Sequence, residues 1–143
     1  MCQHISIVLP NRPGELSRVC AILACNSINI LGHQIASQGN SGMLHLLCDP
    51  HKQAYEKLRG EYRFYCNDKK VLIVSATHVP GEFSRVLRFL SERDLNLDSS
   101  YQAMFQRQIL LVLELRDRES TQLAEKLLLR SNVEVLQQQP TTS

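Results

Sequence analysis

The chain has 143 residues, of which 43% are hydrophobic and 21% are charged, and its formal net charge at pH 7 is +2. These values are typical of globular proteins and argue against wholesale disorder. The small net charge, the absence of tryptophan and an aromatic content of 6% give no sign of a nucleic-acid-binding surface. No apolar run is long enough to span a membrane.

The N-terminus has neither the basic start nor the apolar stretch of a secretory signal peptide. The chain contains an odd number of cysteines, and all of them lie in its first half, namely Cys2, Cys20, Cys25, Cys48 and Cys66. A disulfide framework would call for an even number. We therefore expect reduced thiols and a cytoplasmic protein.

The first half of the chain shows alternating strand and helix patterns. Apolar residues alternate in residues 5–9 and then recur at helical spacing after a Pro-Gly break. The segment Gly39-Asn40-Ser41-Gly42 is a strong hairpin signal. The expected elements are a strand over residues 5–9, a helix over 15–25, strands over 28–36 and 43–48, a helix over 50–58 and a short strand over 62–66.

The second half repeats this order. A polar linker is expected over residues 67–70, and residues 137–143 are expected to form a flexible tail. Between them, the expected elements are a strand over residues 71–76, a helix over 81–92, strands over 97–105 and 108–115, a helix over 120–130 and a closing strand over 133–136.

An internal repeat explains this recurrence. The segment from Pro13 to Val19, PGELSRV, returns as PGEFSRV from Pro80 to Val86, an offset of 67 residues. Each copy has the order β-α-β-β-α-β, which places two helices on one face of an antiparallel sheet. The prediction is an α+β protein of two ferredoxin-like units, with residues 1–68 as the first domain and residues 69–143 as the second.

One sheet face of each unit is left without helices in this arrangement. The strands over residues 71–74 and 109–113 are apolar without alternation, so both of their faces need burial. We therefore expect a homodimer that forms through sheet faces and edges.

The repeated motif resembles that of ACT domains, small ferredoxin-like modules that bind amino acids in metabolic regulation. The matching segments are Asn11-Arg12-Pro13-Gly14-Glu15-Leu16 with Ile28-Asn29-Ile30, and His78-Val79-Pro80-Gly81-Glu82-Phe83 with Leu95-Asn96-Leu97. The resemblance covers residues 3–136. It implies a stand-alone tandem ACT protein that binds a small amino acid where the strand–helix loop of one unit meets a neighbouring unit.

The motif has a physical rationale as an anion site. Pro13 ends the strand, and Gly14 lets the chain turn into a helix whose first N–H groups are free to bind a carboxylate. The candidate ligand-binding residues are Asn11, Arg12, Pro13, Gly14, Glu15, Leu16, Asn29 and Ile30 in the first copy, and His78, Gly81, Glu82 and Asn96 in the second.

Several of these residues also have purely structural interpretations. Asn11, Asn29 and Asn96 could serve as turn formers. Glu15 and Glu82 favour the start of a helix and would disfavour a carboxylate nearby. His78 replaces Asn11 in the second copy and would bring a pH-sensitive group to that site.

The sequence gives no support for catalysis. The cysteines and histidines lack the paired spacing of a zinc site, and no nucleophile, base and acid recur together. We expect a non-catalytic sensor with no metal, no cofactor, and no nucleic-acid or membrane partner. The alternative is a regulator of a protein target, such as a transcription factor or a metabolic enzyme, whose ligand pockets have degenerated.

Overall fold

The structure is a computed structural model that describes residues 1–142, and it divides into two compact units. The N-terminal unit contains residues 3–69 together with residues 140–142, and the C-terminal unit contains residues 1–2 and 70–139. Two domains bounded at residues 68 and 69 remain a proposal from the repeat.

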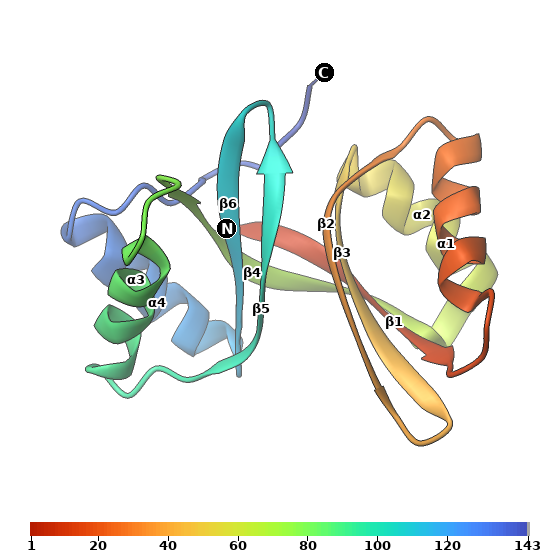
Figure 1. The fold of residues 1–143 in the computed structure, drawn as a ribbon, viewed down its shortest axis with the longest axis horizontal. Coiled ribbons are helices and arrows are strands. Elements are labelled where there is room, and N and C mark those ends of the chain that lie inside the picture. Colours follow the sequence, from red (N-terminus) through yellow and green to blue (C-terminus); the bar gives the residue numbers. More distant parts are fainter. Residues whose placement is uncertain (143) are drawn as a thin grey trace. The chain divides into compact units, whose positions relative to one another are not determined.

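In the N-terminal unit, three strands form an antiparallel sheet with β3 in the middle. Strand β3 (Ser41–Asp49) pairs with β1 (Cys2–Pro10) on one side and with β2 (Asn29–Gln38) on the other. Helices α1 (Glu15–Cys25) and α2 (His51–Tyr62) cover one face of this sheet (Figure 1). A 3₁₀ turn, η1 (Arg63–Tyr65), follows α2 and leads into β4 (Cys66–Ala76).

The C-terminal unit repeats this arrangement with β6 (Gln108–Leu115) in the middle of its sheet. Strand β6 pairs antiparallel with β4 and with β5 (Leu97–Phe105). Helices α3 (Glu82–Ser91) and α4 (Arg118–Arg130) lie together on one face (Figure 1). The α+β class and the ferredoxin-like order of elements are therefore confirmed.

Each unit has its own apolar core between its helices and its sheet, and the two cores use corresponding positions. Ile7 and Val19 of the first core correspond to Val74 and Val86 of the second at the repeat offset, and all four are buried. The burial of equivalent residues explains why the apolar pattern repeats along the chain.

The predicted strand over residues 62–66 and the linker over residues 67–70 are wrong. Tyr62 is the last residue of α2, and Cys66–Ala76 is a single strand. The polar residues 67–70 have the composition of a linker. They can nevertheless belong to a strand when their side chains reach solvent or a polar partner. Asp68 has such a partner, because its carboxylate lies 3.0 Å from Nε2 of the buried His51.

The end of the chain also differs from the expectation. Residues 133–136 contribute one isolated bridge, from Val135 to Val74, in place of a strand. Thr142, which belongs to the predicted flexible tail, donates two hydrogen bonds of 3.1 Å to the Asp49 carboxylate. One comes from its backbone amide and the other from its hydroxyl. Ser143 lies outside the described residues, and the mobility of the tail stays a prediction.

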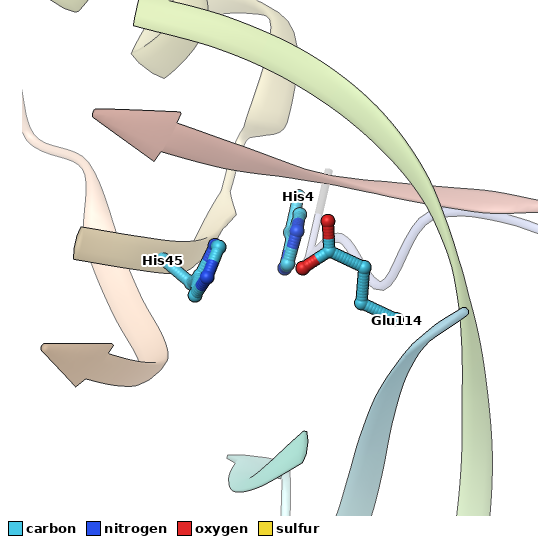
Figure 2. Close-up of side chains that lie close together, drawn as sticks. All are labelled: His4, His45 and Glu114. Atoms are coloured by element: carbon cyan, nitrogen blue, oxygen red, sulfur yellow. The ribbon is translucent and has the colours of Figure 1, made fainter. Parts of the chain in front are cut away.

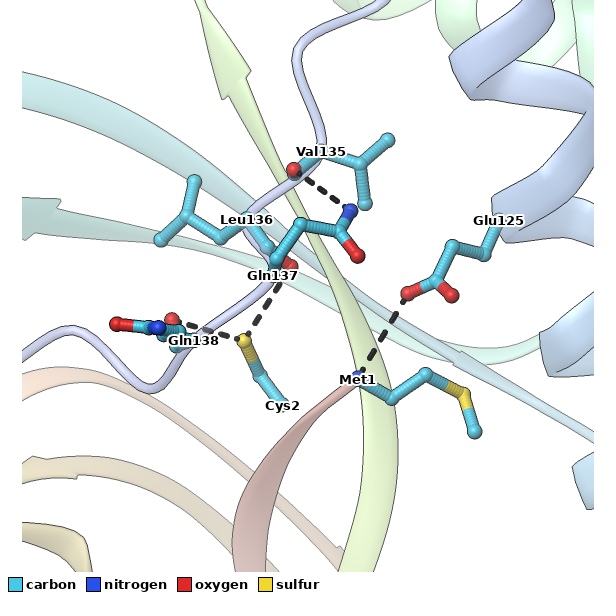
Figure 3. Close-up of polar contacts among 7 residues, drawn as sticks. All are labelled: Met1, Cys2, Glu125, Val135, Leu136, Gln137 and Gln138. Atoms are coloured by element: carbon cyan, nitrogen blue, oxygen red, sulfur yellow. Dashed lines mark hydrogen bonds and ion pairs between the residues drawn. The ribbon is translucent and has the colours of Figure 1, made fainter.

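The first two residues belong to the C-terminal unit. The Met1 amine lies 3.8 Å from the carboxylate of Glu125, and the buried Cys2 thiol donates to the carbonyl of Gln138 at 3.3 Å (Figure 3). Burial raises the pKa of Cys2 to about 11, which keeps this donor protonated at neutral pH.

Candidate functional site

Both strand–helix corners have the same backbone conformation, and neither is capped by a side chain. Gly14 precedes α1 with φ 90° and ψ −12°, and Gly81 precedes α3 with φ 88° and ψ −11°. The amides of Arg18 and Arg85 donate to the carbonyls of Gly14 and Gly81, each at 2.9 Å, and close the first helical turn. The helix starts therefore keep their capacity to interact with an anion.

A cavity of about 720 Å³ lies beside the first corner, within the N-terminal unit. Its walls come from the end of β1, the start of β3, the first turn of α1, the end of α2 and η1. Ligand pockets typically measure about 300–1,000 Å³, so this cavity is large enough for a small metabolite.

Two ion pairs line this cavity. The guanidinium of Arg12 lies 2.7 Å from the Glu15 carboxylate, and that of Arg18 lies 3.0 Å from the Glu61 carboxylate. Both arginine side chains are more than half exposed, so the pairs contribute little to the stability of the fold. Either arginine can therefore exchange its partner for a ligand at small cost.

Tyr62 adds an unsatisfied polar group to the same wall. Its hydroxyl oxygen is buried and has no hydrogen-bond partner among the described residues. Burial raises the pKa of this phenol, so the hydroxyl stays a donor at neutral pH. The guanidinium of Arg18 lies over the Tyr62 ring, 5.5 Å from its centre.

Of the residues predicted in the first copy, Arg12 and Glu15 line the cavity. Pro13, Gly14 and Leu16 form the corner next to it without contributing to its walls. The structure does not bring the others to this cavity. Asn11 holds the hairpin turn through a 3.1 Å hydrogen bond to the Gly39 carbonyl, Asn29 begins β2, and Ile30 packs against the core.

Of the residues predicted in the second copy, His78 and Asn96 line two separate, smaller cavities. His78 lines a cavity of about 370 Å³ at the end of β4, together with Arg107 and Glu134. Asn96 lines a separate cavity of about 260 Å³ beyond the end of α3. Gly81 and Glu82 line neither of them, and Glu82 pairs with Arg85 at 2.8 Å, which lowers the pKa of Glu82 through this hydrogen bond.

Most walls of the large cavity were not predicted from the sequence. Arg18 has the pattern of solvated helix surface, and residues 62–66 have the pattern of a strand. The wall residues that were not predicted are Val8, Leu9, Pro10, Arg18, Asn40, Ser41, Glu61, Tyr62, Arg63, Phe64 and Tyr65. The density of aromatic and arginine residues between positions 62 and 65 is the signal that could have revealed that part of the wall.

A second polar cluster lies on the face of the N-terminal sheet that α1 and α2 do not cover. The buried rings of His4 and His45 stack with their centres 4.9 Å apart and 10° from parallel (Figure 2). Ser6 shares a 2.8 Å hydrogen bond with Nδ1 of His45. These side chains tie β1 to β3 and lie outside the walls of the large cavity.

Comparison with known families identifies the family of the chain. The chain matches the family described as an ACT domain pair over residues 1–141, and it belongs to that family. The resemblance of the repeated motif to ACT domains is thereby confirmed, and with it membership of a regulatory family. No curated protein matches the chain.

Solved structures share the fold over most of the chain. Protein BT0572 from Bacteroides thetaiotaomicron is 27% identical, with 94% of this chain and 91% of that chain covered and a TM-score of 0.78. The ligand-free regulatory subunit of aspartate kinase from Thermus thermophilus is 12% identical, with coverage of 91% and 92% and a TM-score of 0.61. The corresponding subunit from Thermus flavus is 15% identical, with 90% of each chain covered and a TM-score of 0.53. The likeness to the two kinase subunits concerns the fold alone.

Among residues 1–142, no helix is long and apolar enough to cross a membrane.

Proposed function

We propose that this ACT domain pair is a non-catalytic regulatory protein that binds a small amino acid beside its first strand–helix corner. The observation that carries the proposal is the cavity of about 720 Å³ at an uncapped helix start, lined by two separable ion pairs. Because the cavity is lined by both arginine and glutamate side chains, it suits a ligand that carries one positive and one negative charge.

An α-amino acid at neutral pH is such a molecule. Its carboxylate can replace Glu15 or Glu61 as the partner of an arginine, and its ammonium group can pair with the carboxylate so released. The Tyr62 hydroxyl offers one further donor. Because one ligand would satisfy both charges at once, binding leaves no unpaired ion in the cavity.

Regulation follows if the ligand prefers one arrangement of ACT units over another. We propose that the second unit at the site belongs to a neighbouring ACT domain, and that the protein is a homodimer that forms through sheet faces and edges. Exposed apolar side chains on the sheets support this assembly, among them Ile35 on β2 and Met104 on β5. Sedimentation as a monomer at micromolar concentration would contradict the dimer.

The free cysteines support a reducing, cytoplasmic location.

Ligand binding is tested by thermal unfolding and titration calorimetry with the twenty amino acids and a set of purines. A ligand at 100 times its dissociation constant should stabilise the protein by about 2.7 kcal/mol. Arg12→Ala and Glu15→Gln should each weaken binding at least about tenfold, because a charged ligand group loses its partner. Lys126→Ala, which removes an exposed cation on α4, is the matched control. No stabilisation by any compound would overturn the proposal.

A second candidate is a regulator that acts on a protein target without any metabolite. It is favoured by the C-terminal unit, where Val79 takes the place of Arg12 and the cavity at the end of β4 measures only about 370 Å³. Recovery of a stable, identified protein complex from material stripped of small molecules would favour this candidate, provided that the titrations above show no ligand.

A further inference from the structure

Two exposed aromatic side chains form one wall of the large cavity. Phe64 is 92% exposed and Tyr65 is 63% exposed, and both line the cavity together with the apolar residues Val8, Leu9 and Pro10. Phe64 is therefore almost completely exposed, and its ring contributes almost no apolar burial to the stability of the fold. An exposed aromatic pair beside a cavity is the expected composition of a surface that a ligand covers.

The backbone that presents these rings is unusual. Arg63, the first residue of η1, has φ 45° and ψ −112°, a combination that residues with a side chain rarely adopt. This residue ends α2, so Phe64 and Tyr65 do not continue the helix. Residues held in rare backbone conformations are concentrated at ligand-binding sites.

The second copy shows that the fold does not require an aromatic residue at this place. Buried Ala54 and Leu58 of α2 correspond to buried Ala124 and Leu128 of α4, an offset of 70 residues. The residues that follow α4, from Ser131 to Leu136, include no aromatic side chain. The C-terminal unit therefore folds without the exposed aromatic pair that follows α2.

From this difference we infer that Phe64 and Tyr65 are specificity-determining residues that select an α-amino acid with a large apolar or aromatic side chain. The inference rests on the proposed function, since the ion pairs hold the amino and carboxyl groups. With those groups held at the helix side of the cavity, the side chain of the ligand reaches toward η1. It is then enclosed by Val8, Leu9 and the two rings.

The test is titration calorimetry with a series of amino acids of increasing side-chain size. Phenylalanine, leucine and methionine should bind at least about tenfold more tightly than glycine and alanine, a difference of about 1.4 kcal/mol. In the double variant Phe64→Ala/Tyr65→Ala this preference should fall below about threefold. Leu123→Ala, which removes an exposed apolar side chain from α4, should leave the preference intact.

The outcomes distinguish the two proposals. If the wild-type protein binds no amino acid, the proposed function fails and the inference falls with it. If it binds amino acids of all sizes equally, or if the double variant keeps the preference for large side chains, the inference is wrong while the proposed function stands. The comparison of ligands on the wild-type protein requires no variant, so it decides the matter even if the double variant misfolds.

Discussion

The two strand–helix corners allow a sharp test of why glycine occupies them. Gly14 and Gly81 both have φ near 90°, and a Cβ atom added to either would meet nothing within 4 Å. An alanine there would encounter no steric clash with the rest of the protein. Its entire cost should come from holding an L-residue in a left-handed conformation, which is about 1–2 kcal/mol.

Gly14→Ala and Gly81→Ala should therefore destabilise the protein by similar amounts. For a chain of this length the expected fall in melting temperature is about 3–8 °C for each. Because the two residues belong to different units, the losses in the double variant should add. Differential scanning calorimetry gives the melting temperatures, and urea titration gives the free energies of unfolding.

Gly60→Ala is the matched control. Gly60 lies exposed in α2, and an added Cβ would again meet nothing within 4 Å, but its φ is that of a helix. Alanine there should stabilise the protein by about 0.5–1 kcal/mol. The reasoning is refuted if Gly14→Ala and Gly60→Ala change the free energy of unfolding in the same direction.

Two further predictions concern a helix cap and the thiols. The Asp117 carboxylate accepts a 2.7 Å hydrogen bond from the Ser120 amide, which lowers its pKa below 3.8. Asp117→Ala should therefore reduce the melting temperature at pH 7, and the difference from wild type should shrink as the pH falls below 3.8. An equal difference in melting temperature at pH 2 would contradict this prediction. Asp117→Asn, the control variant, should retain much of the stabilisation by the cap. Iodoacetamide at pH 8 should modify the exposed Cys25 before the buried Cys2, Cys48 and Cys66, as read by mass spectrometry, and rapid modification of Cys48 would contradict the fold. Because burial raises the pKa of Cys48 from 9.0 to about 12, and those of Cys2 and Cys66 to about 11, stability should decline as the pH rises from 9 toward 12.

The repeat made most of the fold predictable. A Pro-Gly pair that returns at a fixed offset, with apolar positions that return beside it, identifies two copies of one unit before any element is assigned. The helices and central strands followed from their periodicity. The errors occurred at residues 62–70. The 3₁₀ turn Arg63–Tyr65 that follows α2, and the polar residues 67–70 that follow Cys66 in β4, both lack the usual periodic signal. Local pattern cannot show that Asp68 finds a buried histidine as its partner.

Only a small part of the candidate site was predictable, for a related reason. The corner residues Arg12 and Glu15 belong to the repeated motif and could be identified from it. The opposite wall, from Glu61 to Tyr65, lies about fifty residues further along the chain and reaches the cavity through the packing of α1 beside α2. It is also the part that the second copy does not reproduce. Within a duplicated fold, residues that both copies keep describe what the scaffold needs, and an exposed aromatic residue that only one copy carries points to a use that belongs to that copy.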